Sequence, residues 1–522
     1  MKALFLTDYI VFFSYFICVI GIGLWVARRP KGKQINTEDF FLAGRALPWW
    51  IIGFSVIAAN ISTEQLIGMN GTAFESGIAV ISFQWIGAAV PILIISKYFI
   101  PVFLKMKIYS LPEFLEKRYD TRVSTTMSFY WVLVFVFVNL TSVLSLGAIT
   151  METVLGIPQV YGVIILICLS AIYTVYGGLE SVAKTDIIQV SVLVLGGIAV
   201  TWLGFRAISE GNSVLDGFFK LKSSMPDFFH TVLPASHEEI PWTGVFFGGI
   251  WIGAFGYWGC NQFIIQRALA AKNVKHAQNG LLLSSLLALI VSIIIVFPGI
   301  IARYLYPDMI VLRDQAFPVL IRELLPVGIT GLVIAGLMAA IVSTLNSMTN
   351  STATIFTMDI YKKFSKNTPS EKRLVNVGRI VSAAALITAA LIAPALSSLG
   401  RIFAFIQEYS GYIFPGVLSI FLFGFFWKKT SVLAALLAAI LTIPVSLSIK
   451  LFLPQVQYLD GRTITFLFLC LMMFLVSSFS KKEIKSEFAN IGSEVSFKTT
   501  KTFNFFALLL TAITVALYIY FW

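Results

Sequence analysis

The chain has 522 residues, of which 58% are hydrophobic and 12% are charged, and its mean hydropathy is +0.86. Such a composition leaves too few polar groups to cover the surface of a soluble domain, whereas repeated apolar helices need only lipid around them. The formal net charge of +12 must therefore be accommodated in short connections. These features exclude a soluble globular protein and predict an all-α polytopic membrane protein.

A window of about 20 residues, the length that crosses a bilayer as a helix, predicts about 14 transmembrane helices. The expected spans are 8–27, 49–71, 78–104, 126–155, 160–176, 187–205, 242–265, 280–302, 328–360, 380–396, 402–427, 432–449, 464–479 and 503–522. The connections between them are short, so no separate soluble domain is expected.

The lysine and arginine residues fall unevenly on the two sides of this arrangement. One side receives 28 of the 38, including the clusters at 28–33, 362–373 and 481–485. By the positive-inside rule that side is cytoplasmic, which places both termini outside, extracellular or periplasmic. The protein is thus expected to be a multi-pass integral protein of the cell (inner) membrane. The lipid bilayer is its one structural partner, and the basic clusters require no nucleic acid.

The second predicted span contains a polar run from Asn60 to Gln65, with Glu64 as its ionisable group. Polar groups at this depth are tolerated chiefly where they face a cavity or bind something. The alternative is that the run is a surface loop between two short apolar pieces. We favour a discontinuous helix at a transport site because ionisable residues inside membranes are rare and usually functional.

The seventh span carries a second interruption, the glycine-rich, polar and aromatic sequence from Gly253 to Gln262. It lies five spans after the first interruption. An odd number of spans makes the two five-helix units enter the membrane from opposite sides, as in an inverted repeat whose broken helices meet at a midplane site. The alternative is that glycines here only allow close helix packing. Tyr257, Trp258 and Asn261 arriving together favour the break.

The ninth span adds a run of hydroxyl and amide side chains that begins at Ser343 and Thr344. Neutral oxygens suit a monovalent hard cation, whereas Ca²⁺ calls for several carboxylates. Hydroxyls in membrane helices also form hydrogen bonds to neighbouring helices. The run therefore indicates a cation site only in combination with the broken second span. A proton carried by Glu64 or Asp186 is the alternative coupling ion, which the neutral oxygens disfavour.

The chain resembles the solute:sodium symporter family over essentially its full length, and within it the bacterial sodium/galactose type. The resemblance is carried by the segments 60–62, 64–65, 68–69, 137–144, 185–190, 259–267, 350–361 and 406–409. It implies a LeuT-like core of two inverted five-helix repeats. The implied organisation is an extra N-terminal transmembrane helix and basic cytoplasmic loop at 1–47, the first repeat at 48–209, an extracellular connection at 210–241, the second repeat at 242–427 and three C-terminal transmembrane helices at 428–522.

The same resemblance implies two sites and a path for the ion. Sodium would be bound by the carbonyls of Ala58, Ile61 and Ala340 and the hydroxyls of Ser343 and Thr344. Asp186 would lie on the sodium path, although a carboxylate at a helix N-terminus is an equally simple interpretation of that residue. The substrate-binding residues would be Asn60, Gln65, Gln84, Tyr257, Trp258 and Gln407, and the gates Met69, Tyr257 and Phe403.

Four positions depart from the galactose pattern. Gln84 stands where that pattern has glutamate, Ala254 where it has asparagine, Ala288 where it has lysine, and Gly87 where it has serine. The acidic and the basic sugar contact are lost together, which indicates a changed pocket chemistry. The solute could therefore be another sugar or a different small molecule.

The function that these residues favour is a sodium-coupled secondary active symporter that imports a small neutral solute by alternating access, with a monosaccharide similar to galactose or glucose as the first candidate. The alternatives are the same mechanism with a polyol, inositol or other non-hexose solute, or a solute-gated sodium channel or sensor. An enzyme would need a nucleophile with its base or clustered metal ligands near one membrane face. We expect none, and the oligomeric state stays open.

Overall fold

The computed structural model describes all residues except 1, 28–42, 109, 177–178 and 481–493. Within that part of the chain, helices are the regular elements, and β pairing is confined to two isolated bridges. Short 3-10 and π-helical segments carry the label η. The first helices are α1 (Leu6–Ala27), η1 (Ala43–Arg45), α3 (Trp49–Asn60), η2 (Glu64–Met69), α4 (Asn70–Ser76), η3 (Gly77–Ile81), α5 (Ser82–Gln84), η4 (Trp85–Ala89), α6 (Val90–Tyr98) and α7 (Ile100–Lys105).

The chain continues through the middle of the molecule with long helices. They and their connecting segments are α8 (Leu111–Arg118), α9 (Thr121–Leu133), η5 (Val134–Leu140), α10 (Thr141–Leu155), α11 (Gln159–Tyr176), α12 (Leu179–Ile208), α13 (Val214–Ser224), η6 (Pro226–Phe229), α14 (Trp242–Phe246), α15 (Gly249–Cys260), α16 (Gln262–Leu269) and α17 (Val274–Leu305). The remaining ones are η7 (Pro307–Met309), η8 (Arg313–Gln315), α18 (Ala316–Leu324), α19 (Ile329–Thr354), η9 (Ile355–Tyr361), α20 (Lys362–Phe364), α21 (Glu371–Ser397), α22 (Ile402–Ser410), α23 (Phe414–Phe426), α24 (Val432–Phe452), α25 (Tyr458–Phe479) and α27 (Lys501–Tyr520).

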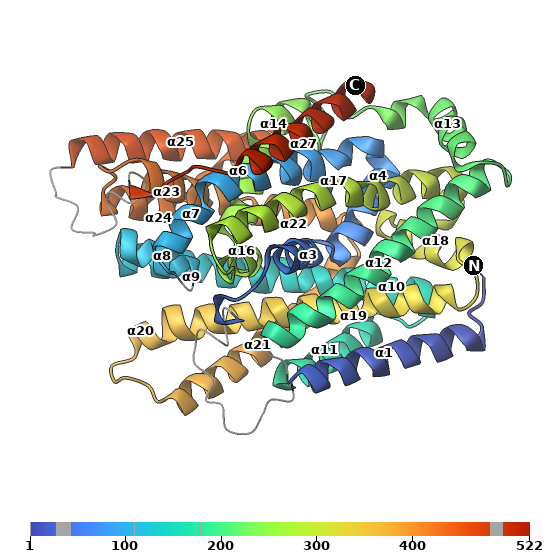
Figure 1. The fold of residues 1–522 in the computed structure, drawn as a ribbon, viewed down its shortest axis with the longest axis horizontal. Coiled ribbons are helices and arrows are strands. Elements are labelled where there is room, and N and C mark those ends of the chain that lie inside the picture. Colours follow the sequence, from blue (N-terminus) through green and yellow to red (C-terminus); the bar gives the residue numbers. More distant parts are fainter. Residues whose placement is uncertain (1, 28–42, 109, 177–178, 481–493) are drawn as a thin grey trace.

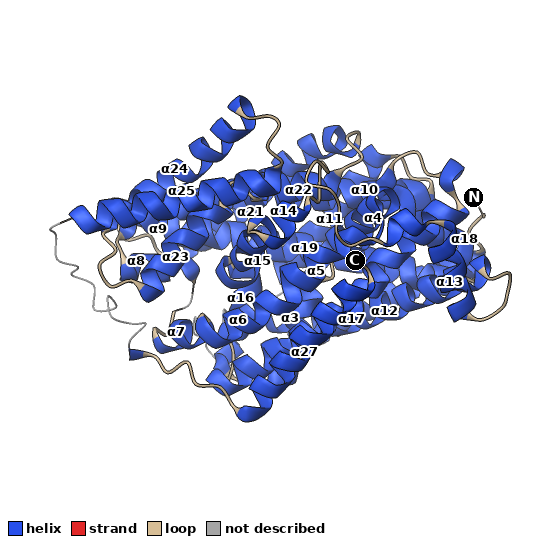
Figure 2. Ribbon diagram, turned by 90° about the horizontal axis from the view of Figure 1, so that it is seen from above, coloured by secondary structure: helices blue, strands red, loops and turns tan. Residues whose placement is uncertain are grey.

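The long helices lie side by side along one direction of the molecule (Figure 1), and the view from above shows them as a bundle of several layers (Figure 2). Two helices organise the bundle. α17 packs along α3 and α4, and α19 packs against α1, α12 and α21. The broken segment that begins with α3 is therefore supported by long, regular helices.

Nine helical stretches in the described residues are long and apolar enough to cross a membrane, or ten if α22 and α23, which meet at 43°, form one span. A helix or interrupted helix lies at each of the 14 expected positions. Several of these are short or broken, so length and composition alone do not establish 14 crossings, and that number stays a prediction. The all-helical, multi-pass membrane architecture is confirmed.

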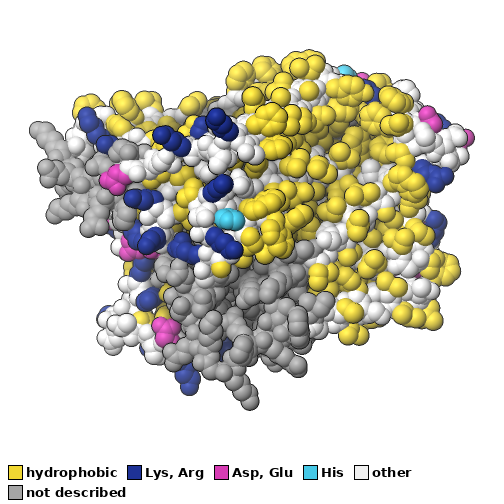
Figure 3. Space-filling view, in the orientation of Figure 1, with side chains coloured by type: hydrophobic (Ala, Val, Ile, Leu, Met, Phe, Trp, Pro, Cys, Tyr) yellow, Lys and Arg dark blue, Asp and Glu magenta, His cyan; other side chains and the backbone are white. Residues whose placement is uncertain are grey.

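The ends of the bundle differ in charge. In Figure 3 lysine and arginine side chains gather at the end away from α13, beside a broad hydrophobic surface. Both termini lie toward the α13 end: the Lys2 amide donates to Glu323 at 2.8 Å, and the Thr231 amide in the 210–241 connection donates to the Phe521 carbonyl at 2.8 Å. The termini thus lie opposite the basic end.

The two predicted helix interruptions are both present, but the second is shorter than expected. α15 runs without a break through Tyr257 to Cys260, and only Asn261 leaves the helical conformation, with φ −103° and ψ 121°. The prediction that the whole stretch from Gly253 is irregular was wrong. Its glycines serve close packing instead, because a Cβ at Gly256 would meet Phe414 and one at Gly259 would meet Phe99.

Candidate functional site

The first interruption frees backbone oxygens between α3 and η2. The Ser62 amide donates to the Asn60 carbonyl at 2.7 Å, and the Glu64 amide donates to Ser62 Oγ at 3.3 Å. These local bonds replace regular helical ones, so the carbonyls of Ala58 and Asn60 lose their usual donors. Gln65 fixes the turn, since its Oε1 accepts from Ser62 Oγ at 2.9 Å. The polar run predicted from sequence is a true break of the helix.

One side of this break faces a small cavity with a volume of about 10 Å³. All five residues expected to bind sodium line it: Ala58, Ile61, Ala340, Ser343 and Thr344. A space of this size holds about one water molecule or an ion of similar size. Its walls therefore combine freed carbonyls of one helix with adjacent hydroxyls of α19.

Two further groups border the small cavity. Gln189 of α12 is among its lining residues, and Asp186 lies about one turn earlier on the same helix. The side chain of Asp186 lies outside the described part of the structure. Arg267 also lines the cavity, but its Nε donates to Ser55 Oγ at 2.9 Å and its Nη1 to the Phe263 carbonyl, so the guanidinium is held by neighbouring protein groups.

The other side of the break faces a central cavity of about 70 Å³. Every residue expected to bind the substrate or to act as a gate lines it: Asn60, Gln65, Met69, Gln84, Tyr257, Trp258, Phe403 and Gln407. These residues come from the two interrupted helices, from the short helix α5 and from α22. Structure and sequence thus agree on the location of the polar groups, and one helix break separates the two cavities.

Tight contacts shape the central cavity. A Cβ at Gly68 would lie 3.0 Å from that of Phe403, so the glycine lets η2 approach α22 closely. The Phe403 ring meets Phe83 edge to face, with centroids 5.2 Å apart. On the facing wall the Trp258 indole donates to the Gly87 carbonyl at 2.9 Å, which joins α15 to η4. Aromatic rings therefore close the cavity while their polar atoms are used within the protein.

Several buried polar atoms of the cavity wall have no hydrogen-bond partner among the residues that the structure describes. They are Glu64 Oε1, Gln84 Oε1, Asn139 Oδ1, Ser410 Oγ and Arg462 Nε. Buried polar groups in native proteins are nearly always paired, because an unpaired one costs about 1–3 kcal/mol. Five such atoms around one cavity are the pattern expected of a site that pairs with a solute carrying several hydroxyl groups.

Four of these groups, those of Glu64, Asn139, Ser410 and Arg462, were not predicted as solute ligands. Glu64 was considered only as a proton carrier, and Asn139 only as part of a family motif; the structure makes Asn139 a hydrogen-bond partner of Glu64. Arg462 comes from α25, outside both expected repeats. Arg462 precedes the expected span 464–479, whereas α25 begins at Tyr458, so the sequence did not place this charge within a membrane helix.

The four departures from the galactose pattern do not occupy equivalent places. Gln84, Gly87 and Ala254 line the central cavity. Ala288 is fully buried in α17 and is not among the lining residues that the structure describes. The changed pocket chemistry predicted from sequence therefore concerns three wall positions, with the fourth packed behind them.

Outside the central cavity lies a larger vestibule of about 620 Å³. Arg462 lines both spaces and so stands at their boundary. The vestibule is otherwise rich in aromatic and charged residues, including Tyr409, Tyr412 and the ion pair of Glu408 with Lys450 at 2.6 Å. Its residues belong to the half of the molecule that contains the 210–241 connection.

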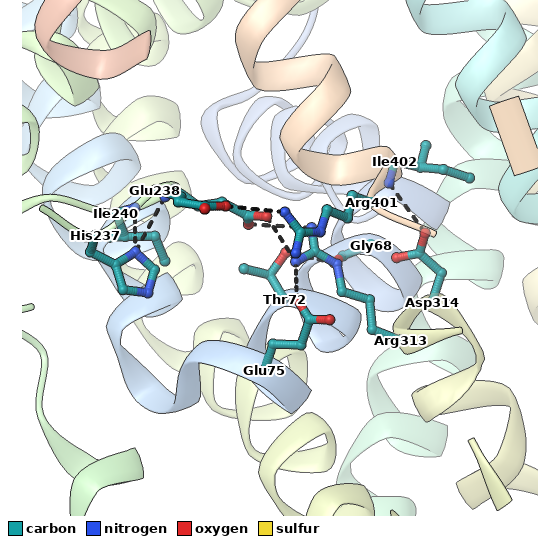
Figure 4. Close-up of polar contacts among 11 residues, drawn as sticks. Gly68, Thr72, Glu75, His237, Glu238, Ile240, Arg313, Asp314, Arg401 and Ile402 are labelled. Carbon is teal, nitrogen blue, oxygen red and sulfur yellow. Dashed lines mark hydrogen bonds and ion pairs between the residues drawn. The ribbon is translucent and has the colours of Figure 1, made fainter. Parts of the chain in front are cut away.

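Next to the vestibule, an ionic cluster ties the second half of the broken helix to that connection (Figure 4). Arg313 is almost fully buried and contacts Glu75 of α4 at 2.6 Å and Glu239 at 2.9 Å. The Glu75 side chain is 42% exposed, but Glu239 is largely buried, and breaking a buried pair such as Arg313 with Glu239 by removing one partner costs about 3–5 kcal/mol. The cluster thus links α4 to the 210–241 connection.

Asp314 extends the cluster to the gate helix. Its Oδ2 accepts from the Ile402 amide at 3.2 Å, at the first residue of α22. Burial raises the pKa of Asp314 to about 7, against the opposing effects of the Arg313 guanidinium and of the Ile402 amide. His237, whose Nδ1 accepts from the amides of Glu239 and Ile240, has a pKa lowered by burial. The protonation of Asp314 therefore changes near neutral pH.

The fold and the two cavities are those of a membrane transporter, and comparison with known proteins shows that it is sodium-coupled. The model of the family described as "Sodium:solute symporter family" matches residues 40–442, and the chain therefore belongs to that family. Its coupling ion is Na⁺, and its relatives are cotransporters, which are not enzymes.

Individual relatives are similar over most of the chain. A sodium/glucose cotransporter of Vibrio parahaemolyticus is 42% identical, with 99% of this chain and 98% of that protein covered. A sodium/myo-inositol cotransporter 2 of Mus musculus is 32% identical over 81% of this chain and 67% of that protein. A substrate-bound, outward-open Na⁺-coupled sialic acid symporter has a TM-score of 0.80 at 23% identity, covering 92% of this chain and 99% of that one. The last likeness shows a shared LeuT-like fold.

Proposed function

We propose that the protein imports a small neutral polyhydroxylated solute, with a monosaccharide similar to glucose or galactose as the first candidate, together with Na⁺. One observation carries the proposal: a single helix break contributes walls to both cavities. Ala58 and Ile61 face the small cavity, whereas Asn60 and Gln65 face the central one. An ion that orders this break also orders the solute site, which is the requirement for coupling.

The chemistry of the two cavities supports this assignment. We assign Na⁺ to the small cavity, with carbonyls of Ala58, Ile61 and Ala340 and hydroxyls of Ser343 and Thr344 as ligands, and passage toward the cytoplasm past Asp186. In the central cavity the unpaired acceptors suit hydroxyl donors, and Tyr257 and Trp258 cover the C–H face of a ring. The relatives named for glucose and myo-inositol carry the same class of solute.

The central cavity is smaller than the roughly 300–1,000 Å³ of typical ligand pockets. We infer that the structure is in a closed form and that the solute enters when the gates Met69, Tyr257 and Phe403 move apart. The proposed arrangement has 14 spans, repeats at 48–209 and 242–427, and both termini outside a cell membrane. The basic end of the bundle then lies in the cytoplasm.

Coupling supplies enough free energy for accumulation. Moving one positive charge inward across about 100 mV releases about 2.3 kcal/mol, and a tenfold sodium gradient adds about 1.4 kcal/mol. Together they support accumulation on the order of several hundredfold. A channel or sensor with the same pocket would show none.

The test is uptake of labelled D-glucose into proteoliposomes with and without an inward sodium gradient. Unlabelled sugars, myo-inositol and other polyols, sialic acids and amino acids serve as competitors. We expect labelled solute to concentrate above its outside level only with sodium. Equilibration without concentration would contradict symport and favour a channel. Competition by amino acids but by no sugar or polyol would overturn the solute class.

A further inference from the structure

The side chain of Arg462 reaches from α25 into the boundary between the vestibule and the central cavity. Its Nη1 donates to the Gly249 carbonyl at 3.0 Å and its Nη2 to the Gln407 carbonyl at 2.5 Å. The residue is only 3% exposed. A third helix, outside the two interrupted regions of the core, thus joins the beginning of α15 to the gate helix α22.

The neighbouring backbone leaves room for this guanidinium. A Cβ at Gly253 would collide with Nη1, and a Cβ at Gly411 would collide with Nη2. These two glycines belong to α15 and to the turn after α22. Any other residue at either position would push the charged group out of its place. The space around Arg462 is therefore made by two separate segments of the chain.

Among the described residues, the buried Nε atom of this guanidinium has no hydrogen-bond partner, whereas two of its other four N–H groups donate to carbonyls. A guanidinium can only donate, so the group that completes it must offer a lone pair. Arg462 lines the central cavity, where the other unpaired atoms belong to Glu64, Gln84, Asn139 and Ser410.

The charges of the cavity favour a neutral solute with several oxygens. Glu64 and Arg462 are the acidic and the basic residue on its described wall. A ring with several hydroxyl groups can donate to the carboxylate and amide oxygens while one of its oxygens accepts from a cation. Ala288, where the galactose pattern has its lysine, is fully buried in α17, so a cation now comes from a different helix.

We propose that Arg462 is a specificity-determining residue of the solute site, whose Nε–H binds one hydroxyl oxygen of the solute at the vestibule end of the central cavity. The inference deepens the proposed function and rests on it. It makes α25, which follows the second repeat, part of the binding site.

The test combines variants of Arg462 with solutes that lack one hydroxyl. Labelled D-glucose uptake is competed with unlabelled D-glucose and with its 2-, 3-, 4- and 6-deoxy derivatives. In the unmodified protein, one derivative should bind at least roughly tenfold more weakly than glucose, as expected for a lost hydrogen bond to a charged group. In Arg462→Lys and Arg462→Gln, glucose should weaken by a similar factor, and that derivative should compete as well as glucose does.

A purely structural role would not remove the discrimination against one particular derivative. The half-saturating sodium concentration, measured at saturating glucose, should change less than about twofold because the charge-assisted bond concerns the solute. Gly411→Ala, which displaces the guanidinium, should abolish the same discrimination. This third variant keeps the test decisive if either replacement of Arg462 itself fails to fold.

Arg118→Gln is the matched control. Arg118 is also a buried arginine that donates to two backbone carbonyls, those of Gly424 and Trp427, but it lies away from both cavities. It should lower stability and leave the ranking of the derivatives unchanged. If the ranking of the deoxy derivatives is unchanged in all the Arg462 and Gly411 variants, Arg462 does not determine specificity. That result would leave the proposed function itself intact. Absence of sodium-dependent glucose uptake by the unmodified protein overturns the monosaccharide proposal as well.

Discussion

The small and the central cavity share one broken helix but differ in how their walls are made. The small one is lined by the end of α3 with Ile61, by a short stretch of α19 and by residues of α12 and α16. The central one is lined by residues from ten helical segments, and five of its buried polar atoms have no hydrogen-bond partner in the described part of the chain. The proposed ion ligands are backbone carbonyls and two hydroxyls, whereas the proposed solute ligands are side chains. Substitutions at the small cavity should therefore change mainly the half-saturating sodium concentration, and substitutions at the central cavity mainly the half-saturating solute concentration.

The largest effect should come from the ion site. Replacing Ser343 and Thr344 together by alanine removes two of the five proposed oxygen ligands. At about 1.5–3 kcal/mol for each interaction with a charge, the half-saturating sodium concentration should rise at least roughly a hundredfold, and Ser343→Ala alone should raise it roughly tenfold. Sodium titrations of solute uptake measure both.

Ser351→Ala is the control for this pair. Ser351 lies about two turns after Ser343 and Thr344 on α19, and its hydroxyl donates to the Ser347 carbonyl. It should leave the sodium dependence as it was. If Ser343→Ala behaves like Ser351→Ala, Ser343 does not bind sodium.

A substitution on the central-cavity side of the same helix break should change the half-saturating solute concentration instead. Glu64→Gln keeps the size of the side chain but removes the charge of the oxygen that we expect to accept from a solute hydroxyl. The half-saturating solute concentration should rise roughly tenfold, with a much smaller change for sodium at saturating solute. Thr72→Val is the control, since Thr72 Oγ1 donates to the Gly68 carbonyl and Thr72 is not a lining residue. A larger shift for sodium than for solute would mean that Glu64 serves the ion.

The residues of the ion site could be predicted from sequence, and those of the solute site only in part. The resemblance supplied Ala58, Ile61, Ala340, Ser343 and Thr344, and the structure brings all five to one cavity; their role in binding stays a proposal. This was possible because the resemblance covers the segments that hold these residues, and the break at Asn60 was visible in the sequence as a polar run. Arg462 could not be placed, since nothing in the sequence fixes how α25 packs against the core.

The same contrast applies to the fold. Hydropathy located a helix at every expected span, because apolar length is a local property. The extent of the second interruption was overestimated, since glycines that permit packing and glycines that end helices have the same local sequence signal. The Asn261 break, limited to one residue, depends on what α15 and α16 contact.

A smaller effect should follow from restoring the acidic residue of the galactose pattern. Gln84 already has an unpaired Oε1 at the cavity wall. Gln84→Glu places a charged acceptor there and should improve competition by D-galactose about fivefold. Ala288→Lys added to it should give no further gain, because Ala288 is fully buried in α17 and a long side chain would overpack that site. Improvement only in the double variant would show that the lysine reaches the solute.

The smallest effect should come from the pH, through the Asp314 cluster that we infer closes the solute site. Burial raises the pKa of Asp314 to about 7 in this closed form, from an ordinary value of 3.8. If opening hydrates Asp314, the closed form holds a proton that the open form releases, so closure is favoured at low pH and loses that advantage as the pH rises through about 7. The charged groups that act on Asp314 are Arg313, Glu239 and Glu75. Raising the outside pH from about 5.5 to about 8 should therefore lower the half-saturating solute concentration by roughly threefold, since a larger fraction of the protein is open.

Asp314→Asn cannot ionise and should flatten this pH profile while the sodium dependence at fixed pH is retained. Asp308→Asn, an exposed change in the same connection, should leave the profile intact. A profile unaltered by Asp314→Asn would place the titrating group elsewhere. Because the small cavity lies on the other side of the helix break, a pH effect on solute but not on sodium would also separate closure above the central cavity from ordering of the ion site.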